Sequence, residues 1–230
     1  MAPQDIAKRA AACAAVREIE DGMRVGIGTG STVAFAIDAL GERCRAGLRI
    51  EAVATSLRSE AAARAAGIPL VDFAGLATVD LCIDGVDEID DALQAIKGGG
   101  GAMLREKIVA TAATRMIAIA DASKLVGQLG AAPLPVEILP FAESFVIAAI
   151  ARLGGAATVR RAADGALYLT DQANAVLDCA FGPIADPAAL AAALSALPGL
   201  LDHGLFLTEI DALYVASGGD VAKRTRIAPR

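Results

Sequence analysis

A glycine-rich turn, GIGTGST at Gly26–Thr32, is the first stretch whose residue types could do chemistry, and it is called the glycine turn below. Glycines let the backbone approach an anion, and a helix that begins directly after them presents free N–H groups to it. The dinucleotide fingerprint needs a glycine where Ser31 stands, and a P-loop needs a lysine that this turn lacks. The turn therefore predicts either a phosphate site without a nucleotide motif or an ordinary helix start with Ser31 or Thr32 as N-cap.

Acidic residues end the next predicted buried strand, in LCIDGVDEID at 81–90. Ligands bind at the carboxyl ends of parallel strands, so Asp84 and Asp87 suit proton chemistry or a divalent metal, and the alternative is a structural acidic turn. A metal is the weaker interpretation. Ca²⁺ loops space more oxygens in a set pattern, and transition metals usually take histidine, of which the chain has one, His203.

Four consecutive glycines, Gly98–Gly101, follow Lys97 in KGGGGAMLREK, and they are called the tetraglycine loop below. A glycine run loses much conformational entropy on folding, which a simple linker does not require, so we expect its backbone to wrap a ligand. Glu106 lies on the first turns of the following predicted helix and is expected to face the same pocket, or to be a solvated helix acid paired with basic neighbours. Lys124, in ADASK after a further strand, either pairs with a phosphate or is an ordinary surface lysine.

Composition bounds the class of function. The chain has 230 residues and a net charge of -6, without a Lys/Arg cluster before its tail, so we expect no nucleic-acid partner. No uncharged apolar run approaches the roughly 20 residues of a membrane span, and the N-terminus lacks a signal-peptide pattern. The cysteines form no C-x-x-C pair and are expected to be reduced packing thiols; they are Cys13, Cys44, Cys82 and Cys179. We therefore expect a soluble cytoplasmic protein that binds a small molecule.

The elements that must position these residues alternate between helix and strand in the first half of the chain. The expected helices cover 4–20, 31–44, 57–66 and 102–114, and the expected strands cover 23–28, 49–55, 79–84, 92–96 and 115–120. Such alternation predicts an α/β fold with a Rossmann-like, mainly parallel sheet and helices on both of its faces.

The pattern changes near Gly130, where GAAPLPVEILPF brings prolines and a short strand. After it we expect a helix over 142–153, strands over 156–162 and 166–179, a helix over 187–197 and a strand over 200–207. This β-α-β-β-α-β order predicts a ferredoxin-like α+β domain. We therefore expect residues 131–205 as an inserted domain, with 1–130 and 206–230 forming the Rossmann-like catalytic domain.

Taken in order, GIGTGST, DGVDEID, KGGGGAMLREK, ADASK, LPVEILP and TDQANAVLD closely resemble ribose-5-phosphate isomerase, type A, and the likeness extends along essentially the whole chain. The resemblance implies an aldose–ketose isomerase that interconverts D-ribose 5-phosphate and D-ribulose 5-phosphate in the non-oxidative pentose phosphate pathway. It implies neither a metal nor an organic cofactor. It also implies a Rossmann-like domain with a ferredoxin-like insert, which agrees with the pattern of elements.

Carried over residue by residue, the resemblance places the proton acceptor on Glu106 and the sugar-phosphate contacts on four stretches. These contacts fall on Thr29, Gly30, Ser31 and Thr32; on Asp84, Gly85, Val86 and Asp87; on Lys97, Gly98, Gly99 and Gly100; and on Lys124. Isomerisation moves a proton between C2 and C1 through an enediolate, so one carboxylate can serve both transfers. Lys97 and the loop N–H groups would stabilise the enediolate oxygens, while Asp84 and Asp87 would orient hydroxyls, one of them assisting ring opening.

Two other functions stay open. A sugar-phosphate-binding sensor on the same scaffold would have less need of Glu106 and Lys97, and usually a DNA-binding segment would precede it, for which the sequence begins too close to its first predicted helix. An amino-sugar phosphate deaminase or a CoA transferase of a related scaffold is the other; a deaminase would want a catalytic histidine near its acids, whereas His203 is expected to pack or to lie on the surface. We expect a homo-oligomer, a dimer before a tetramer, because most soluble oligomers are symmetric homomers.

Overall fold

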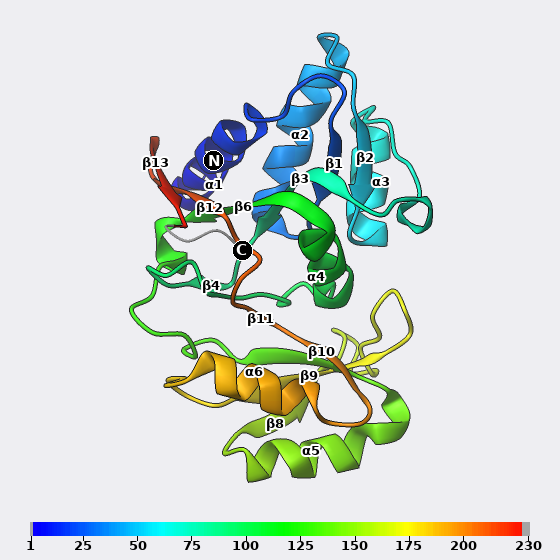
Figure 1. The fold of residues 1–230 in the computed structure, drawn as a ribbon, viewed down its shortest axis with the longest axis vertical. Helices are drawn as coiled ribbons and strands as arrows, with labels where there is room; N and C mark the ends of the chain where they lie inside the picture. The colour runs from blue at the N-terminus through cyan, green and yellow to red at the C-terminus, as the bar shows by residue number, and fades with distance from the viewer. Residues whose placement is uncertain (1, 227–230) are drawn as a thin grey trace. The chain divides into compact units, whose positions relative to one another are not determined.

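The computed structural model describes residues 2–226, which divide into two compact units (Figure 1). Unit 1 contains residues 2–86, 105–124 and 208–226, and unit 2 contains residues 87–104 and 125–207. Each unit has its own sheet and its own buried apolar cluster.

Unit 1 is built on a six-stranded sheet in the order β13-β12-β6-β3-β1-β2. All neighbouring pairs are parallel except β12 with β13. The strands are β1 (Arg24–Ile27), β2 (Glu51–Ala54), β3 (Val79–Gly85), β6 (Ala113–Asp121), β12 (Ala212–Ser217) and β13 (Asp220–Thr225). The helices are α1 (Pro3–Val16), α2 (Ser31–Arg45), α3 (Leu57–Ala65) and α4 (Met103–Ala112), with short turns η1 (Phe73–Gly75) and η2 (Ala122–Lys124). The expected Rossmann-like, mainly parallel sheet is confirmed.

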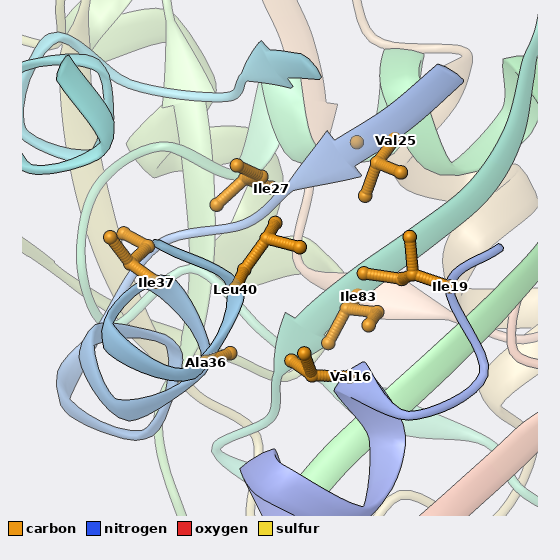
Figure 2. A pocket seen from close by; sticks show the side chains of 9 residues that line it. Val16, Ile19, Val25, Ile27, Ala36, Ile37, Leu40 and Ile83 are labelled. Carbon is orange, nitrogen blue, oxygen red and sulfur yellow. The ribbon is translucent and has the colours of Figure 1, made fainter. Parts of the chain in front are cut away.

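Strand β1 shows how helices cover both faces of this sheet. Val25 and Ile27 turn toward α1 and α2, where they line a small apolar cavity with Leu40 (Figure 2). Gly26 faces the other way, because side chains alternate along a strand, and a Cβ there would lie 2.5 Å from Cγ1 of Val109 on α4. The cavity measures about 10 Å³, close to the space of a single water. It is a packing gap beneath the glycine turn rather than a ligand site.

Unit 2 contains a four-stranded antiparallel sheet in the order β10-β7-β9-β8. Its strands are β7 (Leu134–Ile138), β8 (Ala156–Val159), β9 (Ala175–Ala180) and β10 (Leu200–His203). The helices are α5 (Glu143–Arg152), after the short turn η3 (Pro140–Ala142), and α6 (Pro187–Ser195). A three-stranded sheet joins β4 (Glu88–Ile89), β5 (Ala95–Ile96) and β11 (Leu205–Phe206). The order β7-α5-β8-β9-α6-β10 confirms the expected ferredoxin-like arrangement.

The four-stranded sheet of unit 2 has one apolar and one polar face. Leu134, Val136 and Ile138 of β7 belong to the buried cluster that also holds apolar side chains of α5 and α6. Alternation turns the neighbouring residues, Glu137 on β7 and Asp178 on β9, to the opposite face. The carboxylates on that face can therefore bind groups from the loops of unit 2.

Several expected strands are shorter than the sequence pattern suggests. The strand expected over 92–96 is reduced to β5, because Leu93 has a φ of +58° in a turn between β4 and β5, and it joins the small sheet rather than the parallel one. The strand expected over 166–179 begins only at Ala175, after Ala173 with a φ of +61°. The strand expected over 200–207 breaks at Gly204, so that β10 and β11 join different sheets. The helix expected over 4–20 ends at Val16.

The expected domain boundaries stay a prediction. In the structure the chain passes between the units after residues 86, 104, 124 and 207. Residues 87–104, which were expected to belong with 1–130, group with unit 2 because β5 pairs with β11 there. Residues 227–230 of the expected catalytic domain lie outside the described residues.

Within residues 2–226, no helix is both long and apolar enough to cross a bilayer. The four cysteines are free, and two of them, Cys82 and Cys179, are buried. Burial raises the pKa of the Cys179 thiol to about 12, which keeps it protonated near neutral pH. The packing role expected for the cysteines is therefore confirmed for Cys82 and Cys179, whereas Cys13 and Cys44 are partly exposed.

Candidate active site

The glycine turn of unit 1 runs from β1 into α2 and touches the end of β3. The N–H of Gly28 donates to the carbonyl of Ile83 at 2.9 Å, and the N–H of Thr29 donates to Oδ1 of Asp84 at 3.0 Å. A Cβ on Gly28 would lie 1.9 Å from that same Oδ1, so only glycine permits this approach. Gly30, with a φ of +120°, is the N-cap of α2.

The alternative of Ser31 or Thr32 as N-cap is therefore wrong. Gly30 takes that position, and no side chain of the described residues caps the helix. The first N–H groups of α2 consequently keep the partial positive charge of a helix N-terminus, which favours an anion. Nζ of Lys8 on α1 donates to the Oγ of exposed Ser31 at 3.0 Å and brings a full positive charge to the same place. The sequence analysis did not identify Lys8 as a candidate site residue. A lysine on the first predicted helix is the one feature of the sequence that could have suggested it.

A cluster of hydroxyl side chains holds the glycine turn from behind. Oγ1 of Thr29 lies 3.0 Å from Oγ1 of Thr55, 2.8 Å from Oγ of Ser56 and 3.2 Å from Oγ of Ser59. Ser59 also donates to the carbonyl of Gly28 at 2.6 Å. Thr55, Ser56 and Ser59 are all buried, and sequence reasoning missed them. The available signal is a run of hydroxyl residues directly after a parallel strand, where that strand reaches the carboxyl edge of the sheet.

Asp84 is the penultimate residue of β3 and is fully buried, and its carboxylate accepts hydrogen bonds from the backbone of unit 1. Oδ1 accepts hydrogen bonds from the N–H of Thr29 at 3.0 Å and of Gly85 at 2.7 Å. Val86, also buried, follows and ends this stretch of the unit. The structure thus brings two of the sequence-predicted stretches together, the one beginning at Thr29 and the one beginning at Asp84.

Glu106 lies in the first turn of α4 and is 3% exposed, so the alternative of a solvated helix acid is wrong. A buried carboxylate is poorly shielded by water, which strengthens its effect on a bound group. Lys124 follows β6 in η2 and is half-buried. Against the raising effect of burial, hydrogen bonds from Ser123 and Gln4 and the charge of Lys124 hold the pKa of Asp121 below its usual value.

In unit 2, the residue directly before the tetraglycine loop is a buried lysine. Lys97 is 2% exposed, its N–H donates to the carbonyl of Gly204 at 2.9 Å, and its Nζ lies 5.3 Å from the ring centroid of Phe206. Gly98 and Gly101 have φ values of +102° and +75°, which favour glycine. The N–H of Gly101 donates to the carbonyl of Gly98 at 2.9 Å and closes a turn.

Asp87 contacts this loop. Its Oδ2 accepts the N–H of Gly99 at 2.8 Å within unit 2. The expectation that the N–H groups of Gly98, Gly99 and Gly100 serve a ligand stays a prediction. Asp87 itself is half-buried, whereas Asp84 is fully buried.

Among the described residues, no group of three or more His, Cys, Asp or Glu side chains is arranged to hold a metal ion. His203 is buried on β10, with Nε2 3.2 Å from Oγ of Ser195 on α6 and Nδ1 accepting the N–H of Leu205 at 3.3 Å. It packs β10 against α6, and the packing role expected for it is confirmed.

Comparisons with known proteins agree on one family. The family model described as ribose 5-phosphate isomerase A (phosphoriboisomerase A) matches residues 51–220. The ribose-5-phosphate isomerase A of Sphingopyxis alaskensis is 57% identical over 219 residues, covering 95% of this chain and 96% of that protein. That of Methylorubrum extorquens is 53% identical over 222 residues, covering 94% of each.

Solved structures give the same result. Ribose 5-phosphate isomerase A from Methanocaldococcus jannaschii superimposes with a TM-score of 0.91 at 36% identity, covering 95% of this chain and 97% of that one. A D-ribose-5-phosphate isomerase in complex with phospho-erythronic acid gives a TM-score of 0.92 at 34% identity, with the same coverage of 95% and 97%.

Proposed function

Because this chain belongs to the ribose 5-phosphate isomerase A family, we propose that it interconverts D-ribose 5-phosphate and D-ribulose 5-phosphate. The observation that carries the proposal is the uncapped start of α2 in unit 1. There the glycine turn presents backbone N–H groups, Lys8 adds a charge, and Asp84 leaves no room for a Cβ at Gly28. Such a site fits the phosphate of a small sugar, because it is built for an anion and carries no nucleotide motif.

Binding and chemistry fall to different residues in this proposal. Thr29, Gly30, Ser31 and Thr32 hold the phosphate at the positive end of α2, and Lys124 adds a second cation. The phosphate is the inert end of the substrate. Its binding energy fixes the sugar so that the reacting carbons stay in place.

Glu106 is the base in this proposal. It removes the proton on C2 of the open-chain aldose, the electrons of that C–H bond form the C1=C2 double bond, and O1 takes the negative charge. The proton on O2 moves to O1, and Glu106 returns its proton to C1, which leaves the carbonyl at C2. A single carboxylate therefore serves both transfers. Lys97 stabilises the charge on the enediolate oxygens, an effect worth about 3 to 4 kcal/mol for one well-placed donor.

The two aspartates differ in what their surroundings allow. Oδ1 of Asp84 is committed to the backbone of Thr29 and Gly85, which suits the positioning of a sugar hydroxyl by a rigid group. Asp87 is half-buried, so its surroundings are more open than those of fully buried Asp84. We therefore assign the proton transfer that opens the furanose ring to Asp87.

Replacing Glu106 by Gln tests the proposal. The isosteric amide keeps the shape and loses the base, so kcat for ribulose 5-phosphate formation should fall by about 10²- to 10⁴-fold, with KM within a few fold of wild type. Glu60→Gln is the matched control and should leave kcat unchanged, because the partly exposed Glu60 on α3 pairs with Arg64. Arabinose 5-phosphate should compete with the substrate in the same assay.

Three outcomes contradict parts of this proposal. Near-wild-type turnover by Glu106→Gln removes Glu106 as base. A wild-type protein without activity on ribose 5-phosphate removes the proposed function. Activity that vanishes with EDTA and returns with a divalent ion removes the metal-free mechanism.

The proposal also covers the oligomeric state of the protein and its location in the cell. Exposed apolar side chains on η3 and α5 of unit 2, Phe141 and Phe145 among them, support a homodimer, with a tetramer as the second expectation. Sedimentation of wild type and of Phe141→Ser/Phe145→Ser checks this, and a monomeric wild type rejects it.

The free cysteines support a cytoplasmic location, and the reaction supports a place in the pentose phosphate pathway. Cell fractionation tests the former.

A further inference from the structure

Three consecutive carbonyl groups of the tetraglycine loop are held by two side chains from a later segment of unit 2. Nη1 of Arg160 donates to the carbonyl of Gly98 at 3.0 Å and to that of Gly99 at 3.2 Å. Oη of Tyr168 donates to the carbonyl of Gly100 at 3.4 Å. These contacts span 61 to 68 residues of sequence, so they are tertiary features of the unit and not part of the local turn.

Arg160 is itself fixed before it reaches the loop. Its Nε donates to Oδ2 of Asp178 at 2.9 Å, and its Nη2 donates to Oδ1 of the same carboxylate. The guanidinium carbon lies 5.8 Å from the ring centroid of Tyr168, and the arginine side chain is only 14% exposed. Asp178 stands on the polar face of the four-stranded sheet. The planar guanidinium group of an arginine can donate hydrogen bonds to a carboxylate from one edge and to carbonyl groups from another. The single ammonium group of a lysine cannot bind both in this fixed geometry.

Holding these carbonyls also sets the direction of the loop N–H groups. A peptide unit is planar, so fixing the carbonyl of one residue fixes the N–H of the next. The carbonyl of Gly98 thereby orients the N–H of Gly99, which donates to Asp87, and the carbonyl of Gly99 orients the N–H of Gly100. Four glycines have no side chains to restrict their own dihedral angles, so the restriction must come from outside the loop.

We infer that Arg160, oriented by Asp178, and Tyr168 are positioning residues that fix the tetraglycine loop for catalysis. In this role they touch no substrate. They hold the peptide planes that follow Lys97 in one arrangement, so that the groups meant for the developing negative charge need no reorganisation when it forms. The inference rests on the proposed isomerase function, because it concerns the loop that this function uses.

The experiment compares Arg160→Ala with Arg161→Ala, whose exposed arginine donates to the carbonyl of Gly165 four residues along the chain. We expect Arg160→Ala to lower kcat for ribose 5-phosphate by about 10- to 100-fold, the size of effect produced by a small misplacement of reacting groups, with KM within about threefold. Millimolar guanidinium chloride should restore part of the lost kcat, and urea at equal concentration should not. Asp178→Asn should lower kcat by a smaller factor, and Arg161→Ala should match wild type.

A second measurement does not depend on turnover. Amide hydrogen exchange by NMR should be faster by about tenfold or more at Gly99 and Gly101 in Arg160→Ala, with exchange in α5 and α6 unchanged. Wild-type exchange rates at these amides, or unchanged kcat and KM, overturn the inference. Loss of kcat together with faster exchange throughout unit 2 and no rescue also overturns it, since that pattern indicates general destabilisation. If the wild type fails to convert ribose 5-phosphate, the proposed function fails, and the exchange data still decide whether Arg160 holds the loop.

Discussion

The glycine turn of unit 1 and the tetraglycine loop of unit 2 are both rich in glycine, but different forces hold them. The glycine turn is fixed by the carboxylate and backbone of an adjacent strand, where Gly28 lies against Asp84 with no room for a methyl group. The tetraglycine loop is fixed by side chains, Asp87 and Arg160 among them, that reach its backbone. At Gly28 the first segment therefore needs glycine for a close contact with a buried strand residue, whereas the second segment takes its rigidity from side chains that reach its backbone.

Substitution of one lysine in each unit, Lys97 or Lys124, should distinguish substrate binding from catalysis. These substitutions have the largest expected effect on the kinetic constants. Lys97 is buried at the start of the tetraglycine loop, whereas Lys124 is half-buried after β6. Lys97→Met should lower kcat by about 10²- to 10³-fold, because it removes a donor to the enediolate. Lys124→Met should mainly raise KM, by about tenfold, because it removes a charge from the phosphate. Steady-state kinetics with ribose 5-phosphate measure both.

The control for the lysine pair is Lys107→Met, on the second turn of α4, which should change neither constant by more than about twofold. If Lys97→Met changes only KM, then Lys97 binds the ground state and does not act on the transition state. If Lys124→Met lowers kcat as much as Lys97→Met does, the proposed division between a lysine that binds the phosphate and a lysine that acts on the enediolate fails.

Alanine substitutions test the difference between the two glycine segments directly. A Cβ at position 28 would lie 1.9 Å from Oδ1 and 2.6 Å from Cβ of buried Asp84, which has no room to move. A Cβ at position 99 would lie 2.8 Å from the carboxylate end of half-buried Asp87, which can turn away. Gly28→Ala should therefore lower the free energy of unfolding by about 1 to 3 kcal/mol and abolish most activity, whereas Gly99→Ala should change stability by less than about 1 kcal/mol.

Gly75→Ala is the matched control for this pair. Gly75 has no heavy atom within 4 Å of an added Cβ, and its φ is not positive, so the substitution should be neutral in urea denaturation. Equal destabilisation by Gly28→Ala and Gly99→Ala would show that both segments need glycine for the same reason. The order of the two values is the decisive quantity.

The sequence predicted the site of unit 1 better than that of unit 2, and the reason is the range of the contacts. The glycine turn, Asp84 and Glu106 belong to strand–turn–helix patterns that can be recognised from a short stretch of sequence. In a parallel sheet the carboxyl ends of the strands lie at the same edge, so residues at these ends come together. The resemblance drawn from six motifs is confirmed by the family comparisons.

The parts that sequence reasoning missed depend on tertiary contacts between residues far apart. Nothing near Arg160 in the sequence indicates that it reaches Gly98, because Arg160 follows β8 and is placed by the pairing of that strand with β9. The hydroxyl cluster around Thr55 and the early break at Gly204 are similar cases. Gly204 is required because a Cβ there would lie 2.2 Å from the carbonyl of Lys97, a contact that only the folded unit creates.

A partly buried carboxylate in unit 1, Glu18, and a fully buried one in unit 2, Glu137, extend the comparison to the dependence of stability on pH, which carries the smallest expected effect. In unit 1, burial raises the pKa of Glu18, but hydrogen bonds from Lys223, Tyr214 and Arg115 outweigh it and lower the pKa from 4.5 to about 2. In unit 2, burial raises the pKa of Glu137 despite hydrogen bonds from Asn174 and Thr170. The first carboxylate is therefore stabilised as an anion by the fold, and the second is not.

These opposite shifts predict opposite dependences of stability on pH. Glu18 has a lowered pKa in the folded state, so its contribution is present above about pH 4.5 and is lost as the pH falls toward 2. Glu18→Gln should lower the free energy of unfolding by about 2 kcal/mol near neutral pH and by little near pH 2.

Glu137 has a raised pKa in the folded state, so the wild type loses stability as the pH rises from the ordinary carboxyl pKa through the raised value. Glu137→Gln removes that loss and should gain stability relative to wild type as the pH rises above the ordinary carboxyl pKa, because a neutral amide can still accept the bonds from Thr170 and Asn174. Urea denaturation midpoints at a series of pH values measure both variants, with Glu60→Gln as the control. If both variants shift in the same direction with pH, burial alone decides the charge of these groups, and the hydrogen-bond donors around Glu18 do not set unit 1 apart from unit 2.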